Sequence, residues 1–158
     1  MESNFLAELH PRIVHFPVAL LSTYAVLEII GIIFKKDSIN KCALLLLCLG
    51  VVAAFLAVLS GNGAFSSFQF WTSESTAVLN EHQKYATFLL WSSLIICAIR
   101  LFLTLKKKFV GYKKFVFIIF SIFILFLVYE TGAQGGKLVT KFGIGTDTIL
   151  DKRTNNEK

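Results

Sequence analysis

The stretch that decides the fold is residues 115–128, which reads Phe-Val-Phe-Ile-Ile-Phe-Ser-Ile-Phe-Ile-Leu-Phe-Leu-Val. It carries no charge and shows no alternation of apolar with polar residues. Strands of a membrane barrel alternate over segments of about 10 residues, whereas a helix that crosses a bilayer is apolar without interruption. The stretch therefore predicts a transmembrane helix.

Three further runs have the same character, and the composition agrees with them. Of the 158 residues, 55% are apolar and 16% are charged, which leaves too few polar groups to cover a water-soluble domain. A helix crosses a hydrocarbon layer of about 30 Å with about 20 residues. We therefore predict an all-α fold, an integral membrane four-helix bundle, with helices at about 13–34, 42–60, 84–105 and 113–131. They form one domain at residues 1–150, followed by a polar tail at 151–158.

Lysines gather in two of the three predicted connections. The connection after the first helix holds Lys35, Lys36 and Lys41, and the one after the third holds Lys106, Lys107, Lys108, Lys113 and Lys114. By the positive-inside rule both connections are cytoplasmic. The middle connection and both termini are then extracytoplasmic, so the bundle is N-out and C-out with a short extracytoplasmic C-terminal extension. We expect the lipid bilayer as partner and no nucleic acid, because no basic stripe lies away from the membrane edge.

The three cysteines, Cys42, Cys48 and Cys97, all fall inside apolar runs. No pair of them has the spacing of metal ligands. The pattern favours small buried hydrophobic side chains over a disulfide framework or a zinc site.

The three histidines all fall near extracytoplasmic helix ends. His10 and His15 stand at the start of the first helix with Pro11 and Pro17, and His82 lies where the third helix begins. Proline is tolerated in a first helical turn, where its missing N–H would be unpaired in any case. Either Pro11 opens the helix and Pro17 bends it, or Pro17 opens it after an ordered lead-in.

Two of these histidines are candidate ligands of a cofactor. The first and third helices cross in the same direction, so His15 and His82 lie at similar depth. Two imidazoles from different transmembrane helices can hold a haem iron from both faces. We predict His15 and His82 as axial ligands of haem b, with His10 as an orienting or alternative ligand. Another metal, a quinone headgroup and a purely structural role remain open, and no residue is predicted to be catalytic.

Two charges fall inside predicted helices. Glu28 and Arg100 lie at similar depth, toward the cytoplasmic leaflet, where an isolated charge is costly. Either they form an ion pair, or Arg100 extends its side chain to the inner headgroups. At the other end of the bundle, Glu130, Gly135 and Gly136 predict a helix stop and an outer-face turn, because glycine permits positive φ.

Two motifs resemble those of a known family. The chain opens with Leu9-His10-Pro11-x-x-Val14-His15-Phe16-Pro17-x-Ala19-Leu20 and closes with Gly135-Gly136-Lys137-Leu138-Val139-Thr140-Lys141-Phe142-Gly143-Ile144-Gly145. They resemble a family of bacterial predicted four-helix membrane proteins of unknown function. The resemblance implies an acidic residue late in helix one, a glycine-containing end of helix two, and a histidine that opens helix three. These match Glu28, Ser60-Gly61 and His82.

The chain departs from that family at Lys137, Thr140 and Phe142, where members often carry an acidic residue, a tyrosine and a histidine. In some bacteria related domains are fused to c-type cytochromes, so the resemblance implies redox or respiratory chemistry. We therefore predict a small electron-transfer or respiratory-accessory subunit, with other membrane or cytochrome subunits as partners. The alternative is a non-catalytic structural subunit of a larger membrane complex. No hydrolase motif is present, and four helices without repeats do not favour a transporter.

Overall fold

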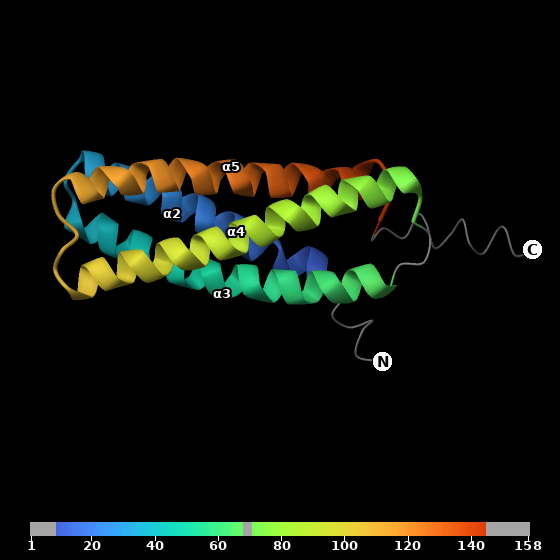
Figure 1. Ribbon diagram of the computed structural model, residues 1–158, viewed down its shortest axis with the longest axis horizontal. Coiled ribbons are helices and arrows are strands. Elements are labelled where there is room, and N and C mark those ends of the chain that lie inside the picture. The colour runs from blue at the N-terminus through green and yellow to red at the C-terminus, as the bar shows by residue number, and fades with distance from the viewer. Residues whose placement is uncertain (1–8, 68–70, 145–158) are drawn as a thin grey trace, which may run out of the picture.

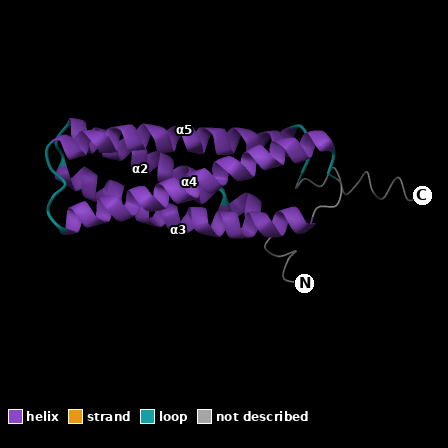
Figure 2. Cartoon of the chain, in the orientation of Figure 1, coloured by secondary structure: helices purple, strands orange, loops and turns teal. Residues whose placement is uncertain are grey.

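The computed structural model describes residues 9–67 and 71–144. Its long helices are α2 (His15–Ile33), α3 (Asp37–Ser67), α4 (Ser73–Leu105) and α5 (Tyr112–Thr140). The described residues contain no strand (Figure 1, Figure 2). The prediction of an all-α four-helix fold is confirmed. The predicted tail at 151–158 lies outside the described residues, as does Gly145 of the closing motif.

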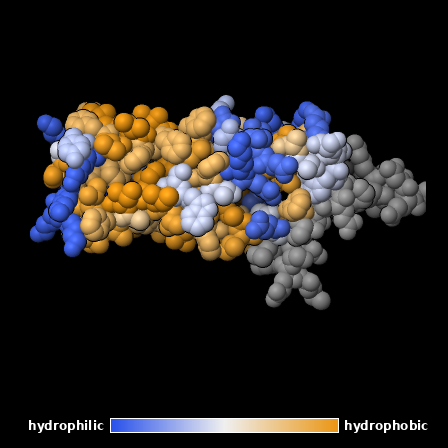
Figure 3. Space-filling model, in the orientation of Figure 1, coloured by the Kyte–Doolittle hydropathy of each residue, from blue (hydrophilic) through white to orange (hydrophobic). Residues whose placement is uncertain are grey.

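All four helices are long and apolar enough to cross a membrane, the first of them counted from Leu9. The candidate spans within them, of 25, 29, 33 and 29 residues, exceed the roughly 20 that a span requires. In Figure 3 apolar side chains form a broad band across the bundle, and hydrophilic side chains lie on either side of it. Large exposed apolar residues such as Phe55, Trp91 and Ile119 suit contact with lipid rather than water.

The two ends of the bundle differ in their chemistry. The turn between α2 and α3 and the connection between α4 and α5 share one end (Figure 1). We call it the lysine end, because it carries Lys35, Lys36, Lys106, Lys107 and Lys108. The opposite end holds the start of α2, the end of α3, the start of α4 and the end of α5, and we call it the terminal end.

The helices form a ring in which each packs against two neighbours. Helix α2 contacts α3 and α5, and α4 contacts the same two helices. Within the described residues α2 and α4 make no direct helix contact, so they are diagonal to each other. Any bond between them must therefore be made by side chains that cross the bundle interior.

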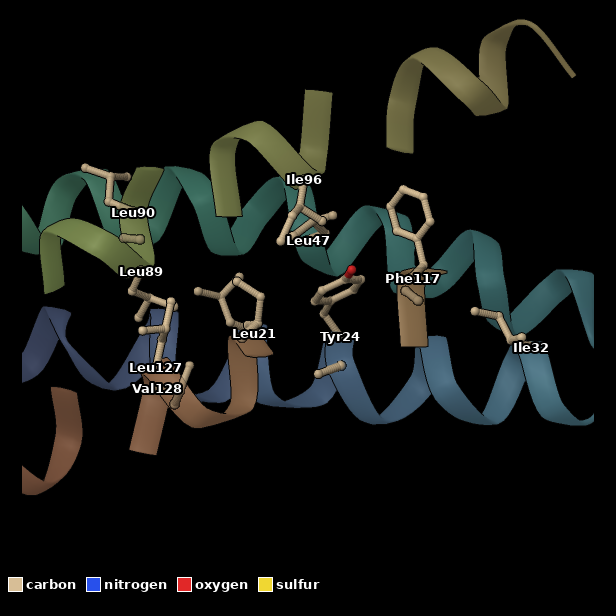
Figure 4. Close-up of a cluster of buried hydrophobic side chains, with 14 residues drawn as sticks. Leu21, Tyr24, Ile32, Leu47, Leu89, Leu90, Ile96, Phe117, Leu127 and Val128 are labelled. Atoms are coloured by element: carbon tan, nitrogen blue, oxygen red, sulfur yellow. The ribbon is translucent and has the colours of Figure 1, made fainter. Parts of the chain in front are cut away.

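The interior is filled by apolar side chains from all four helices. Figure 4 shows them stacked along the axis: Leu21, Tyr24, Ile32, Leu47, Leu89, Leu90, Ile96, Phe117, Leu127 and Val128. Close packing of α2 on α3 depends on two glycines. A Cβ at Gly50 would lie 2.6 Å from Leu21, and one at Gly31 would lie 2.2 Å from the Asn40 amide oxygen. Both distances are too short for any larger residue.

The first helix begins before Pro17. Residues 9–13 are helical, and Val14 keeps helical backbone angles of −62° and −23° before α2 begins at His15. Pro17 is buried inside the helix. Of the two alternatives that the sequence left open, the structure therefore has Pro11 in the first turn and Pro17 within the helix.

Two helices extend beyond the ends predicted for them. Helix α3 continues beyond Ser60-Gly61 to Ser67. Helix α4 begins at Ser73, with Thr72 as its cap: the Ser75 N–H donates to Thr72 Oγ1 at 3.1 Å, and the Thr72 N–H donates to Ser75 Oγ at 2.9 Å. This reciprocal pair satisfies two backbone donors that a helix start would leave open.

The predicted outer-face turn at Glu130, Gly135 and Gly136 is also wrong, because all three lie inside α5. The left-handed backbone that ends this segment occurs later, at Gly143, where φ is 66°. There the Ile144 N–H donates to the Leu138 carbonyl at 3.0 Å. Glycine does end the segment, as expected of a helix C-terminus, but at a later position than the sequence indicated.

Candidate functional site

His10 lies at the terminal end, in the helical turn that precedes α2. Its Nδ1 atom is 2.9 Å from Ser60 Oγ of α3, and that hydroxyl donates its proton to the Ala57 carbonyl at 3.0 Å. Because the hydroxyl proton is already used, Ser60 can only accept from the imidazole. His10 Nδ1 is therefore the protonated nitrogen, and in the neutral ring Nε2 keeps a free lone pair.

His82 is held in an equivalent way by α5. Its Nδ1 atom is 3.0 Å from the Thr131 carbonyl oxygen. A carbonyl only accepts hydrogen bonds, so His82 Nδ1 carries the proton. Its Nε2 atom is therefore also free to act as an acceptor or a metal ligand when the ring is neutral.

Each imidazole packs closely against a glycine of the neighbouring helix. A Cβ at Gly61 of α3 would lie 3.0 Å from His10 Cε1, and a Cβ at Gly135 of α5 would lie 3.2 Å from His82 Cε1. Gly132 and Gly136 have no atom within 4 Å of such a Cβ. Gly61 and Gly135 thus allow a close approach of ring to helix backbone, a use of glycine that needs no turn.

His10 and His82 lie at the same end of the bundle, His10 against α3 and His82 against α5. The two rings lie close enough that a positive charge on one would repel a positive charge on the other. His15, by contrast, is exposed at the start of α2, and no side-chain hydrogen bond is found for it among the described residues. The predicted pairing of His15 with His82 stays a prediction, and the structure gives it no contact.

Two neutral imidazoles with free Nε2 atoms have a defined chemical capacity. A hydrogen bond from Nδ1–H to an oxygen fixes the tautomer and orients Nε2 toward a metal. No group of three or more histidine, cysteine or acidic residues that could hold a metal ion occurs in the described part of the chain. His10 and His82 could supply two nitrogen ligands.

Glu28 and Arg100 meet toward the lysine end. Arg100 Nε lies 2.7 Å from Glu28 Oε1, and the two side chains are 3% and 0% exposed. Arg100 also donates to Thr104 Oγ1 at 2.5 Å, and its guanidinium carbon lies 3.3 Å from the centroid of the Phe109 ring. Of the two alternatives from the sequence, the structure has the ion pair, with further partners that the sequence did not indicate.

Sequence reasoning missed several partners of these residues. The oxygen that holds His82 belongs to the backbone of Thr131, which leaves no signal in residue type. Ser60 was named only as part of the end of helix two, and its bond to His10 was not predicted. The proximity of Cys48 to Cys97, whose sulfur atoms are 3.5 Å apart, was not visible in a spacing of 49 residues.

Comparison with known proteins identifies one family. A family described as predicted membrane protein (DUF2231) matches residues 7–148, which includes every described residue of the site. No curated protein and no solved structure is significantly similar to the chain.

Proposed function

The chain belongs to the family of predicted membrane proteins DUF2231, and we propose that it is a small electron-transfer or respiratory-accessory subunit that binds haem b between His10 and His82. One observation carries the proposal. Each imidazole donates its Nδ1–H to an oxygen of a neighbouring helix, which leaves the lone pair of Nε2 on each neutral ring available to a metal.

Haem b suits this pair because a bis-histidine centre needs two protein ligands and apolar surroundings. Leu79, one turn before His82, and Leu138, near the end of α5, are both buried and offer such surroundings. When bound, haem supplies one-electron transfer. The chain's own residues hold the two imidazoles in a fixed tautomer and keep water away from them.

The proposal changes the assignment of ligands made from the sequence. His10 takes the place of His15, because His10 is part-buried and bonded to Ser60 whereas His15 is exposed. His82 keeps its predicted role. The positive-inside rule supports a cytoplasmic lysine end, which would put the haem near the extracytoplasmic face of a bacterial inner membrane.

The test is an absorption spectrum of the protein purified after expression with ample haem, oxidised and then reduced with dithionite. We expect the bands of a low-spin bis-histidine haem b. His10→Ala and His82→Ala should each remove the low-spin spectrum. His15→Ala is the matched control, since it removes an imidazole from the same end of the molecule, and it should retain the spectrum.

A specific observation favours the rival function, a non-catalytic structural subunit. Each histidine forms a hydrogen bond to a neighbouring helix, His10 to α3 and His82 to α5. These bonds stabilise helix packing, and that role needs no cofactor. A colourless protein, in which the same two substitutions lower only thermal stability, would contradict haem binding and favour this structural role.

A further inference from the structure

Two thiols from different helices meet in the half of the bundle nearer the lysine end. Cys48 of α3 and Cys97 of α4 have their sulfur atoms 3.5 Å apart. The chain has three cysteines, and the third, Cys42, is exposed on α3. All three are free thiols. The short sulfur–sulfur distance thus belongs to Cys48 and Cys97, which come from two different helices.

We propose that Cys48 and Cys97 are a redox-active dithiol, which closes into a disulfide between α3 and α4 with a lipid-soluble quinone as the oxidant. Each thiol gives up its proton, a sulfur–sulfur bond forms, and the two electrons and two protons pass to the quinone, which becomes a quinol. A disulfide bond is about 2.05 Å long. The sulfurs must therefore approach by about 1.5 Å from their 3.5 Å separation, which side-chain rotation and a small helix shift supply.

The depth of the pair determines the class of oxidant. Cys48 and Cys97 lie within apolar runs of two candidate membrane spans, where charged molecules do not enter. Both thiols are only half-buried, and the nearby Leu49 and Leu94 are exposed on the surface that suits lipid. An uncharged two-electron acceptor dissolved in the bilayer can therefore reach the pair, and a polar oxidant cannot.

The buried Tyr24 hydroxyl lies near the pair. It interacts electrostatically with Cys97 and lies next to the Ser121 hydroxyl. In Figure 4 it points away from α2, toward the side of the bundle where Leu47 and Ile96 lie. Thiolate is the reactive form of cysteine, and a hydroxyl that turned from Ser121 to donate to the sulfur would lower the cost of forming it.

The experiment uses the full-length chain in membrane vesicles and counts free thiols. The Cys42→Ser protein keeps the proposed pair and no other cysteine. The Cys97→Ser protein is the matched control: it keeps Cys42 and Cys48, six positions apart on α3 and so separated by about 9 Å along the axis. Both proteins are treated with a short-chain ubiquinone analogue, unfolded in detergent with excess maleimide, and weighed by mass spectrometry.

We expect the oxidised Cys42→Ser protein to take up no maleimide, to weigh less by two hydrogens, and to take up two maleimides after treatment with dithiothreitol. The Cys97→Ser control should take up two maleimides before and after quinone. Full alkylation of Cys42→Ser after quinone would overturn the proposal, even if copper–phenanthroline closes the pair, because quinone would then not be the oxidant. Equal loss of thiols in both proteins would also overturn it, since the oxidation would not depend on the pair.

Discussion

At the scale of the residue, the histidine site depends on atoms whose donor and acceptor roles are fixed. Ser60 gives its proton to Ala57 and can only accept from His10, and the Thr131 carbonyl can only accept from His82. Each imidazole therefore keeps one orientation and one tautomer. A change that moves either ring by a few tenths of an ångström should weaken its bond, because hydrogen bonds lose strength steeply as their geometry worsens.

Gly135→Ala tests this dependence. The new Cβ would lie 3.2 Å from His82 Cε1, and the ring cannot retreat without stretching its bond to Thr131. We expect a lower midpoint of thermal unfolding in detergent than for Gly136→Ala, whose Cβ meets nothing within 4 Å. Gly136→Ala itself should be neutral or stabilising, since alanine in a helix interior is favoured over glycine by about 0.5–1 kcal/mol. Equal midpoints for the two variants would show that His82 is not tightly held.

The buried ion pair makes a second prediction at this scale. Glu28→Gln leaves the Arg100 charge without its counter-ion, and breaking a buried pair in this way costs about 3–5 kcal/mol. Thr104 and Phe109 still contact the guanidinium, so we expect the lower part of that range. The measurement is the free energy of unfolding in mixed micelles by denaturant titration.

The control for Glu28→Gln is Glu81→Gln, which removes one carboxylate of the exposed pair with Lys84. Surface pairs contribute about 0–1 kcal/mol, so this change should leave the free energy of unfolding nearly unaltered. If both substitutions cost the same, the Glu28–Arg100 contact contributes no more than a surface pair.

At the scale of the element, the apolar runs predicted where helices exist but not where they end. The predicted stops at Ser60-Gly61 and at Gly135-Gly136 rested on glycine as a breaker. In the structure Gly61 and Gly135 lie within helices and let the rings of His10 and His82 pack close to the helix backbone. Tertiary contacts therefore maintain the helix at positions where local propensity disfavours it. This use of glycine has no local signature in the sequence.

The helix ends at the lysine end were not predicted from the sequence, because residues other than glycine occupy the left-handed position there. Helices α2 and α4 end with lysines in the left-handed backbone region, Lys35 at φ 52° and Lys107 at φ 54°. The following N–H groups close the turn, from Lys36 to the Gly31 carbonyl at 2.9 Å and from Lys108 to the Leu103 carbonyl at 2.8 Å. Glycine is the usual residue at this position, so a lysine there does not indicate a helix end.

Lys107→Gly should therefore stabilise the protein. A non-glycine residue in the left-handed region costs roughly 1–2 kcal/mol, and glycine removes most of that cost. Lys106→Gly is the matched control, because it removes the same charge from the end of α4 at a residue whose φ is −81°. We expect the unfolding midpoint to rise for Lys107→Gly relative to Lys106→Gly. The reverse order would mean that α4 does not end in this turn.

At the scale of the whole molecule, side chains from the α2 segment and α4 interact across the bundle at both ends. His10 and His82 lie within electrostatic range of each other at the terminal end, and Glu28 bonds Arg100 toward the lysine end, although the backbones of α2 and α4 do not approach each other in the described structure. Depth was predictable from the sequence for Glu28 and Arg100, since it follows from counting residues along parallel helices. For the histidines the same count selected His15, which lies five residues after His10.

Direction around the helix was not predictable, and His15 was therefore chosen on depth alone. In a soluble helix the polar face identifies the surface. Here lipid covers the outside, so Val18 and Val26 are exposed while Leu21 and Ala25 are buried, and all four residues are apolar. With no contrast between the faces, the sequence could not indicate that His15 points outward and His10 inward.

The orientation of the molecule in the membrane is the last prediction. The lysine end carries the lysines at 35, 36, 41, 106–108, 113 and 114, whereas the described part of the terminal end carries fewer basic residues, namely Arg12, Lys84, Lys137 and Lys141. Lysine and arginine close to membrane spans are in excess on the cytoplasmic side. A reporter that is active only in the cytoplasm should therefore be silent when fused after Lys158 and active when fused after Lys107. A reporter that is active only after export should give the opposite result at each site, which controls for poor expression of either fusion. Cytoplasmic activity of the Lys158 fusion would reverse the orientation and move the histidine site to the cytoplasmic face.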